Sequence, residues 1–194
     1  MRAEDTTMTD TATRNALYDQ FEEALTKVGG TCERVASPAD AAQAIATLAA
    51  DTDDPPWTAP QVRRAMPSLI AALESAGAGP RFPASIADAR DQPFGLTTAR
   101  QAIAETGSVI LVERDLIDRS VSLMTETCIV ACALDALAAS LDDAGETLAA
   151  VSREHGSYAT LVTGPSRTAD IERQLTVGVQ GPSRLHVIFI ERPD

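Results

Sequence analysis

The densest group of residues able to do chemistry is the run 163–172, Thr-Gly-Pro-Ser-Arg-Thr-Ala-Asp-Ile-Glu. A strand-like apolar run ends there on a Gly-Pro turn, and the pattern predicts a helix from Ser166 to Val177. The first N–H groups of a helix lack intrahelical partners and lie at the positive end of its dipole, so such a turn can hold a carboxylate or phosphate. The residues expected to form this ligand site are Thr163, Gly164, Pro165, Ser166, Arg167, Thr168 and, behind the direct contacts, Asp170.

The same run also has a purely structural interpretation. Ser and Thr are routine helix caps, and Asp170 and Glu172 in a first helical turn favour the dipole without any ligand. These two acids would also oppose a bound anion if they faced it, which places them behind the contact residues. Both interpretations stay open at the level of the sequence.

A second candidate group is Glu105-Thr106-Gly107, which ends a predicted helix over 97–105 and precedes an apolar strand over 108–113. Glu105 is a candidate general base or ligand contact. Thr106 and Gly107 are expected to contact the ligand, because glycine allows a close approach of the backbone. The alternative is an exposed acid at a helix end followed by an ordinary glycine stop.

Composition limits the partners that these groups can serve. The 194 residues are 44% hydrophobic, which fits one globular domain, and the net charge of -12 argues against nucleic acid or an anionic membrane surface. Residues 1–60 carry eleven acids and four basic groups, whereas residues 164–194 carry four of each. The C-terminal turn therefore need not repel an anion.

Few side chains suit metal or redox chemistry. Lys27 is the single lysine, His155 and His186 are the two histidines, and the three cysteines do not form a zinc or iron–sulfur pattern. Cys128 and Cys132 are four residues apart, so they share one strand face and are expected to pack in the core. We therefore expect no cofactor and no metal on this chain. With no signal peptide or membrane span visible, the expected compartment is the cytoplasm.

The elements that must position these groups alternate between short apolar strands and helices. Residues 1–12 are expected to be a disordered polar tail, with a helical N-terminal segment over 15–28 and the α/β domain over 13–194. The other predicted strands are 31–36, 81–85, 127–133, 158–163 and 185–191; the other predicted helices are 37–50, 61–75, 134–141 and 145–155; a turn is predicted at 93–95. This alternation is typical of a single-domain, doubly wound and mostly parallel sheet. Ligands bind such sheets at the carboxyl ends of the strands, where the 163–166 turn is expected to lie.

Five segments, spread over residues 80–190, resemble the LUD domain, the family that includes lactate utilisation protein C. They are 95–99, 102–108, 163–172, 178–182 and 185–187. The resemblance implies a fold similar to that of glucosamine-6-phosphate deaminase, ribose-5-phosphate isomerase and the CoA transferases. It also implies a cofactor-free subunit of a system that oxidises L-lactate to pyruvate with partner proteins, at least one of which carries iron–sulfur clusters.

The chain departs from the family pattern at chemically relevant positions. Gln180 and Cys128 stand where the family usually has His, and Thr125 stands where it usually has Pro. No catalytic role is assigned to these positions, which leaves Glu105 as the weak catalytic candidate. His186 matches the pattern but lies in an apolar strand, which favours a packed histidine. Two other functions stay open: a stand-alone enzyme or binding protein for CoA thioesters, phosphosugars or small carboxylates, and a non-catalytic assembly or regulatory protein.

Overall fold

The computed structural model describes residues 3–50, 52, 55–154, 158–169, 175–177 and 181–193, and five of its strands form an all-parallel sheet in the order β1-β11-β6-β3-β2. The strands are β1 (Thr31–Val35), β2 (Trp57–Thr58), β3 (Phe94–Thr98), β6 (Thr127–Ala133) and β11 (Arg184–Ile190). The central strand β6 is buried along nearly its whole length and pairs with β11 and β3. The predicted α/β fold with a mostly parallel sheet is thus confirmed.

Helices cover one face of this main sheet. They are α2 (Pro38–Leu48), α3 (Pro60–Ala65) and α4 (Pro67–Ser75). Ser37 caps α2 as its sequence predicts, because its side chain accepts a hydrogen bond from the Asp40 N–H and Pro38 occupies the first turn. Ile129 and Ile188 of the sheet share one buried core with these helices. Helix α5 (Leu116–Met124) packs across the start of β3.

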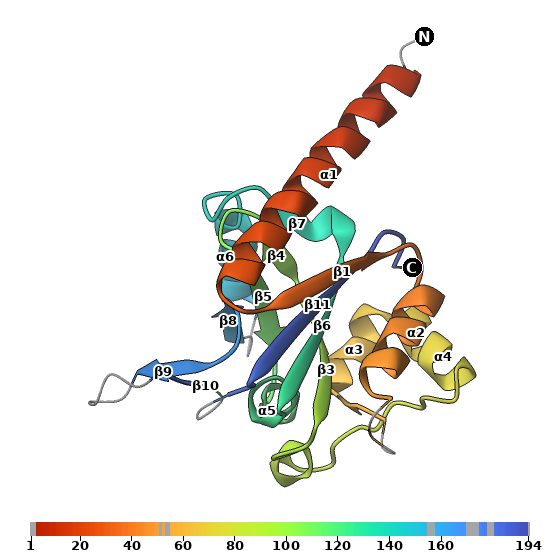
Figure 1. The fold of residues 1–194 in the computed structure, drawn as a ribbon, viewed down its shortest axis with the longest axis vertical. Helices are drawn as coiled ribbons and strands as arrows, with labels where there is room; N and C mark the ends of the chain where they lie inside the picture. The colour runs from red at the N-terminus through yellow and green to blue at the C-terminus, as the bar shows by residue number, and fades with distance from the viewer. Residues whose placement is uncertain are drawn as a thin grey trace.

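The other face is covered by a second sheet and by helix α1 (Ala3–Lys27), instead of the helices expected on both faces. The second sheet has the order β7-β4-β5-β8 and comprises β4 (Gln101–Ile103), β5 (Ser108–Glu113), β7 (Leu137–Ala138) and β8 (Tyr158–Val162). Phe21 of α1 packs edge-on against Phe189 of β11, with ring centroids 4.9 Å apart. Figure 1 shows α1 running past both sheets and projecting beyond them. It begins at Ala3, within the stretch expected to be a tail.

Three predicted helices are wrong because strand pairing overrides local spacing. Residues 97–105 contain the end of β3 and the strand β4, whose ladders with β6 and β5 bury Thr97 and Ile103. Residues 134–141 form the 3-10 turn η2 (Leu134–Ala136) followed by β7. Residues 166–177 contain the antiparallel strands β9 (Arg167–Ala169) and β10 (Leu175–Val177). No helix therefore begins at Ser166, and its dipole cannot attract an anion there.

The remaining elements are closer to expectation. The helix α6 (Gly145–Arg153) matches the predicted helix over 145–155. The predicted turn at 93–95 is instead the beginning of β3, and the predicted strand over 81–85 is reduced to a single bridge between Arg81 and Trp57 before the short 3-10 helix η1 (Ile86–Ala89).

Candidate functional site

The 163–166 turn was predicted to lie at the carboxyl ends of the parallel strands, but it lies at the opposite end of the main sheet. It follows β8, which runs antiparallel to β5 in the second sheet, so the prediction that it extends a parallel strand is wrong. Its neighbours across the cavity described next are Cys128 and Leu185, each the second residue of its strand in the main sheet. The turn therefore faces the amino ends of β6 and β11.

A cavity of about 200 Å³ lies beside this turn. It is lined by Leu111, Ser122, Leu123, Cys128, Leu161, Val162, Thr163, Gly164, Ser166, Gly181, Pro182 and Leu185. Among the described residues the wall is mostly apolar, and the hydroxyl-bearing side chains in it are Ser122, Thr163 and Ser166. Mostly apolar walls with a few polar groups are typical of sites for small organic ligands. Three of the predicted contact residues, Thr163, Gly164 and Ser166, thus share one cavity.

A chain of hydroxyls connects the two groups of residues that the sequence singled out. The Thr106 Oγ1 donates to Ser108 Oγ at 2.7 Å, and Ser108 Oγ lies 2.6 Å from Thr163 Oγ1. The structure therefore brings Thr106 into the same network as Thr163. Ser108, the first residue of β5, is the buried link that sequence reasoning missed.

The glycines of both groups make room for the end of helix α1. Gly107 and Gly164 have positive φ angles of 64° and 76°. A Cβ on Gly107 would lie 2.7 Å from Leu25 Cα, and a Cβ on Gly164 would lie 2.8 Å from Val28 Cγ2. Distances this short are incompatible with a side chain, so both glycines are explained by the packing of α1 against the two turns.

Arg167 belongs to the same contact. Its Nη2 donates a hydrogen bond to the carbonyl oxygen of Val28, just beyond the C-terminus of α1. A cation at this place satisfies an exposed carbonyl and complements the negative end of the helix dipole. Arg167 does not line the cavity, and its predicted role as a ligand contact stays a prediction.

The other predicted contacts are placed less completely. Pro165 is half-buried beside Gly164. Thr168 lies in β9, but its side chain is outside the described residues, as is the whole of Asp170. Ligand contacts by these three residues stay predictions.

Glu105 lies on the turn between β4 and β5, not at the helix end that was predicted. Its exposed carboxylate accepts a hydrogen bond from the Leu141 N–H at 3.1 Å, which holds the loop after β7. The same loop is fixed by the bond from the Glu105 N–H to the Ala139 carbonyl oxygen. This geometry gives Glu105 a structural task, and its proposed role as a base stays a prediction.

Sequence reasoning missed a buried carboxyl behind the cavity wall. Glu113 ends β5 and is fully buried, and its Oε1 lies 2.5 Å from the Oγ of Ser122. Its other oxygen has no hydrogen-bond partner among the described residues. The signal was available, because Glu113 is in phase with the inward-facing Val109 and Leu111. A buried carboxyl beside a cavity is a functional-site candidate.

The surroundings of Glu113 favour the protonated form of its carboxyl. Burial raises the pKa of the Glu113 carboxyl above its usual value, and the charge of Asp118 adds to this. Ser122 Oγ donates to Glu113 Oε1 and also lies 3.1 Å from the carbonyl oxygen of Arg119, so its one hydrogen is shared between two acceptors.

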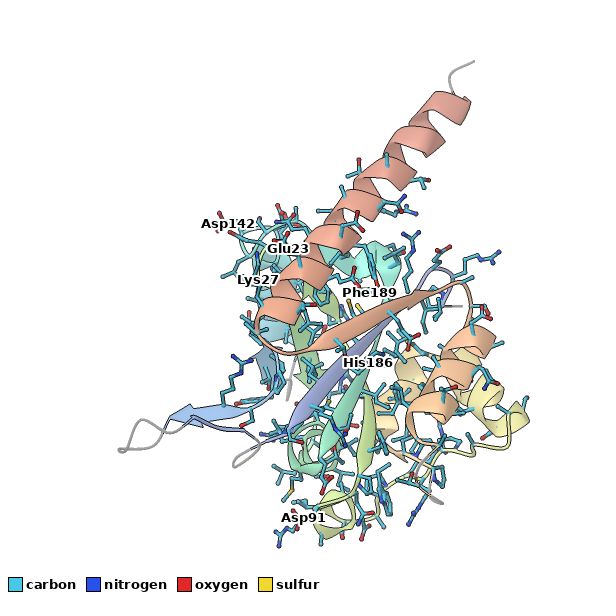
Figure 2. All side chains as sticks on the ribbon, in the orientation of Figure 1. Glu23, Lys27, Asp91, Asp142, His186 and Phe189 are labelled. Carbon is cyan, nitrogen blue, oxygen red and sulfur yellow. The ribbon has the colours of Figure 1, made fainter. Side chains whose placement is uncertain are left out.

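The remaining chemical residues are mostly structural. Cys128 and Cys132 are buried in the core between the sheets, as predicted, and burial raises the pKa of the Cys128 thiol to about 12. His186 is a packed histidine: its Nδ1 lies 2.7 Å from Thr31 Oγ1 and its Nε2 lies 3.0 Å from Glu33 Oε1. Figure 2 labels it on β11. Gln180, His155 and Glu172 lie outside the described residues.

Comparisons with known proteins place these features in a family. The family model described as LUD domain matches residues 86–190. Proteins named lactate utilization protein C are 33% identical over 100 residues in Macrococcus caseolyticus and 38% identical over 96 residues in Deinococcus radiodurans. These alignments cover 50% and 49% of this chain, and 43% and 45% of the relatives. The chain therefore spans about half the length of the curated relatives it matches.

The fold has a solved counterpart. The crystal structure of a DUF162 family protein from Deinococcus radiodurans matches with a TM-score of 0.65 and 24% sequence identity, covering 91% of this chain and 98% of that one. This likeness supports the fold alone. In the described part of the chain, no helix is long and apolar enough to cross a membrane.

Proposed function

The chain belongs to the LUD domain family, and from this premise we propose that it takes part in lactate utilisation as a cytoplasmic subunit of a system that oxidises L-lactate to pyruvate. The printed name of its curated relatives, lactate utilization protein C, supports this proposal. In the proposed system the chain holds the small acid and binds no cofactor of its own.

The observation that carries the proposal is the position of the cavity in the sequence. Its lining residues lie between Leu111 and Leu185, entirely within the segment that matches the LUD domain. A small hydroxy acid would place its methyl group against the apolar wall and its oxygens near the hydroxyls of Ser122, Thr163 and Ser166. The apolar wall with its three hydroxyls is the feature that supports this class of substrate.

The proposed reaction divides its tasks between proteins. Conversion of lactate to pyruvate removes two electrons and two protons, and ordinary side chains cannot carry the electrons. In this proposal they pass to iron–sulfur clusters on partner proteins. In this proposal the two protons are released to water.

The test is growth on L-lactate of a strain that carries variants of this protein. Leu123 lines the cavity and is 42% exposed, so Leu123→Trp should cover the cavity without disturbing the core. Leu116 lies on the same helix and is 55% exposed but does not line this cavity, which makes Leu116→Trp the matched control. We expect loss of growth with the first variant and normal growth with the second, at equal thermal stability.

Partner binding is tested separately by purifying the tagged protein from its native host. Co-purification of iron–sulfur proteins, seen as iron and acid-labile sulfide, is the expected result. Normal growth on L-lactate after deletion of the gene would refute the proposed role. Thermal stabilisation by CoA thioesters or sugar phosphates, but not by lactate or pyruvate, would instead favour a stand-alone enzyme.

A further inference from the structure

A second cavity, of about 310 Å³, lies at the carboxyl end of the main sheet, where β3 ends. Its lining includes Thr98, the last residue of β3, and Gln61, which follows β2 closely. In open α/β sheets the carboxyl ends of the parallel strands are the usual place for a ligand. This cavity therefore occupies the position in which the sequence predicted the 163–166 turn.

Three arginines from three different elements line this cavity. Arg64 comes from α3, Arg100 from the link between β3 and β4, and Arg114 from the residue after β5. The one acid in the lining is Glu154. In a chain with a net charge of -12, this is a local concentration of positive charge. Guanidinium groups offer several N–H donors in a plane that matches carboxylate and phosphate oxygens.

Glu154 shows how an anion is received between two of these arginines. Its Oε1 lies 3.7 Å from an Arg100 Nη2, and its Oε2 lies 3.4 Å from an Arg114 Nη2. Charge-assisted hydrogen bonds are usually about 2.7–2.9 Å long, so these contacts are loose. The side chains of Arg100 and Arg114 are 56% and 62% exposed. Both can thus turn toward an anion that enters from solvent.

The base of the cavity is polar but uncharged. Gln61 is buried, and its Nε2 donates to Thr97 Oγ1 at 2.8 Å, which fixes the amide. Thr98 is buried beside it. Arg64 has a similarly long ion pair, since its Nη2 lies 3.7 Å from Oδ2 of the buried Asp118. The three cationic groups therefore surround a polar base.

We propose that this cavity binds a small dianion, either a phosphate monoester or a dicarboxylate, between Arg64, Arg100 and Arg114. The negatively charged oxygens of such a ligand take the place that the Glu154 carboxylate fills loosely. This site is separate from the cavity beside Ser166 and does not depend on the function proposed for it.

The test is isothermal titration calorimetry of the full chain at low salt with two probes, inorganic phosphate and succinate. Arg100→Gln and Arg114→Gln should each weaken binding about tenfold or more, because each removes charged hydrogen bonds. Arg63 is the matched control: it neighbours Arg64 on α3, but its guanidinium lies 4.0 Å from the centre of the Phe82 ring. Arg63→Gln should leave binding unchanged.

Glu154→Gln separates a ligand site from a set of structural ion pairs. It removes the competing carboxylate, so it should tighten binding of the probe, and a gain in affinity cannot result from misfolding. Preference for phosphate or for succinate identifies which dianion the site takes. The proposal is overturned if neither probe binds, if Arg63→Gln weakens binding as much as Arg100→Gln, or if Glu154→Gln also weakens it.

Discussion

Replacing Gly164 by alanine tests whether the 163–166 turn is shaped to receive the end of helix α1. Gly164 has a φ angle of 76°, and a Cβ there would lie 2.8 Å from Val28 Cγ2 and 3.0 Å from the Val28 carbonyl oxygen. Gly77, after α4, has a nearly identical φ angle of 75°, but a Cβ there would meet no atom within 4 Å. Both glycines therefore need a left-handed backbone, but only Gly164 is also packed against a neighbouring residue.

The expected energies follow from this difference. A left-handed backbone costs a non-glycine residue about 1–2 kcal/mol, which is the whole effect expected for Gly77→Ala. Inserting a methyl group into a well-packed contact costs about 1–3 kcal/mol more, so Gly164→Ala should lose about 2–5 kcal/mol. Val28→Ala removes Cγ2 and should recover part of that packing loss in the double variant, although the Val28 carbonyl oxygen stays in place.

The assay is equilibrium unfolding in urea, with the free energy of unfolding compared across the four variants. A double-mutant cycle for Gly164 and Val28 should give a favourable coupling between the two substitutions. Equal losses for Gly164→Ala and Gly77→Ala, together with zero coupling to Val28, would refute the inference that α1 dictates the glycine.

Three further predictions concern single side chains. The raised pKa of Glu113 means that the native state keeps a proton which the unfolded chain releases near pH 4.5, so the free energy of unfolding should fall as pH rises above that value. Glu113→Gln should remove this part of the fall, and an unchanged pH profile would contradict it. Arg167→Ala should speed amide exchange in the last turn of α1, because the Val28 carbonyl loses its donor. Native Cys128 is buried and its thiol has a pKa of about 12, so it should react with a thiol reagent at pH 8 far more slowly than the unfolded chain does.

The sequence predicted the layers that depend on long apolar runs. The strands over 108–113, 127–133 and 185–191 are nearly continuous in buried residues, and runs of this length and composition are typical of buried β-strands. The helix at Ser37-Pro38 was equally well defined by its cap. Two of these strands, β6 and β11, lie in the main sheet, β5 lies in the second sheet, and the helix belongs to the layer that covers one face of the main sheet. The main-sheet strand β3, by contrast, was predicted as a turn and part of a helix.

The sequence could not predict where short strands pair. The segments 97–105 and 166–177 have helix-compatible spacing, and only pairing in the folded chain makes 101–103, 167–169 and 175–177 β-strands. The error at Ser166 changed the chemistry as well, because the predicted anion site rested on a helix N-terminus. Glu113 was missed although its spacing from Val109 and Leu111 places it on the inward face of β5.

The two groups of residues selected from the sequence prove to be one structural unit. Thr106-Gly107 and Thr163-Gly164 are both Thr-Gly turns, each with a threonine hydroxyl in the network through Ser108 and a left-handed glycine against the end of α1. Thr163 also lines the cavity. The end of α1 and the cavity wall are therefore mechanically joined, so a ligand that orders Thr163 should also protect the amides at the end of α1 from exchange. Protection confined to the cavity wall would show that the two Thr-Gly turns serve packing alone.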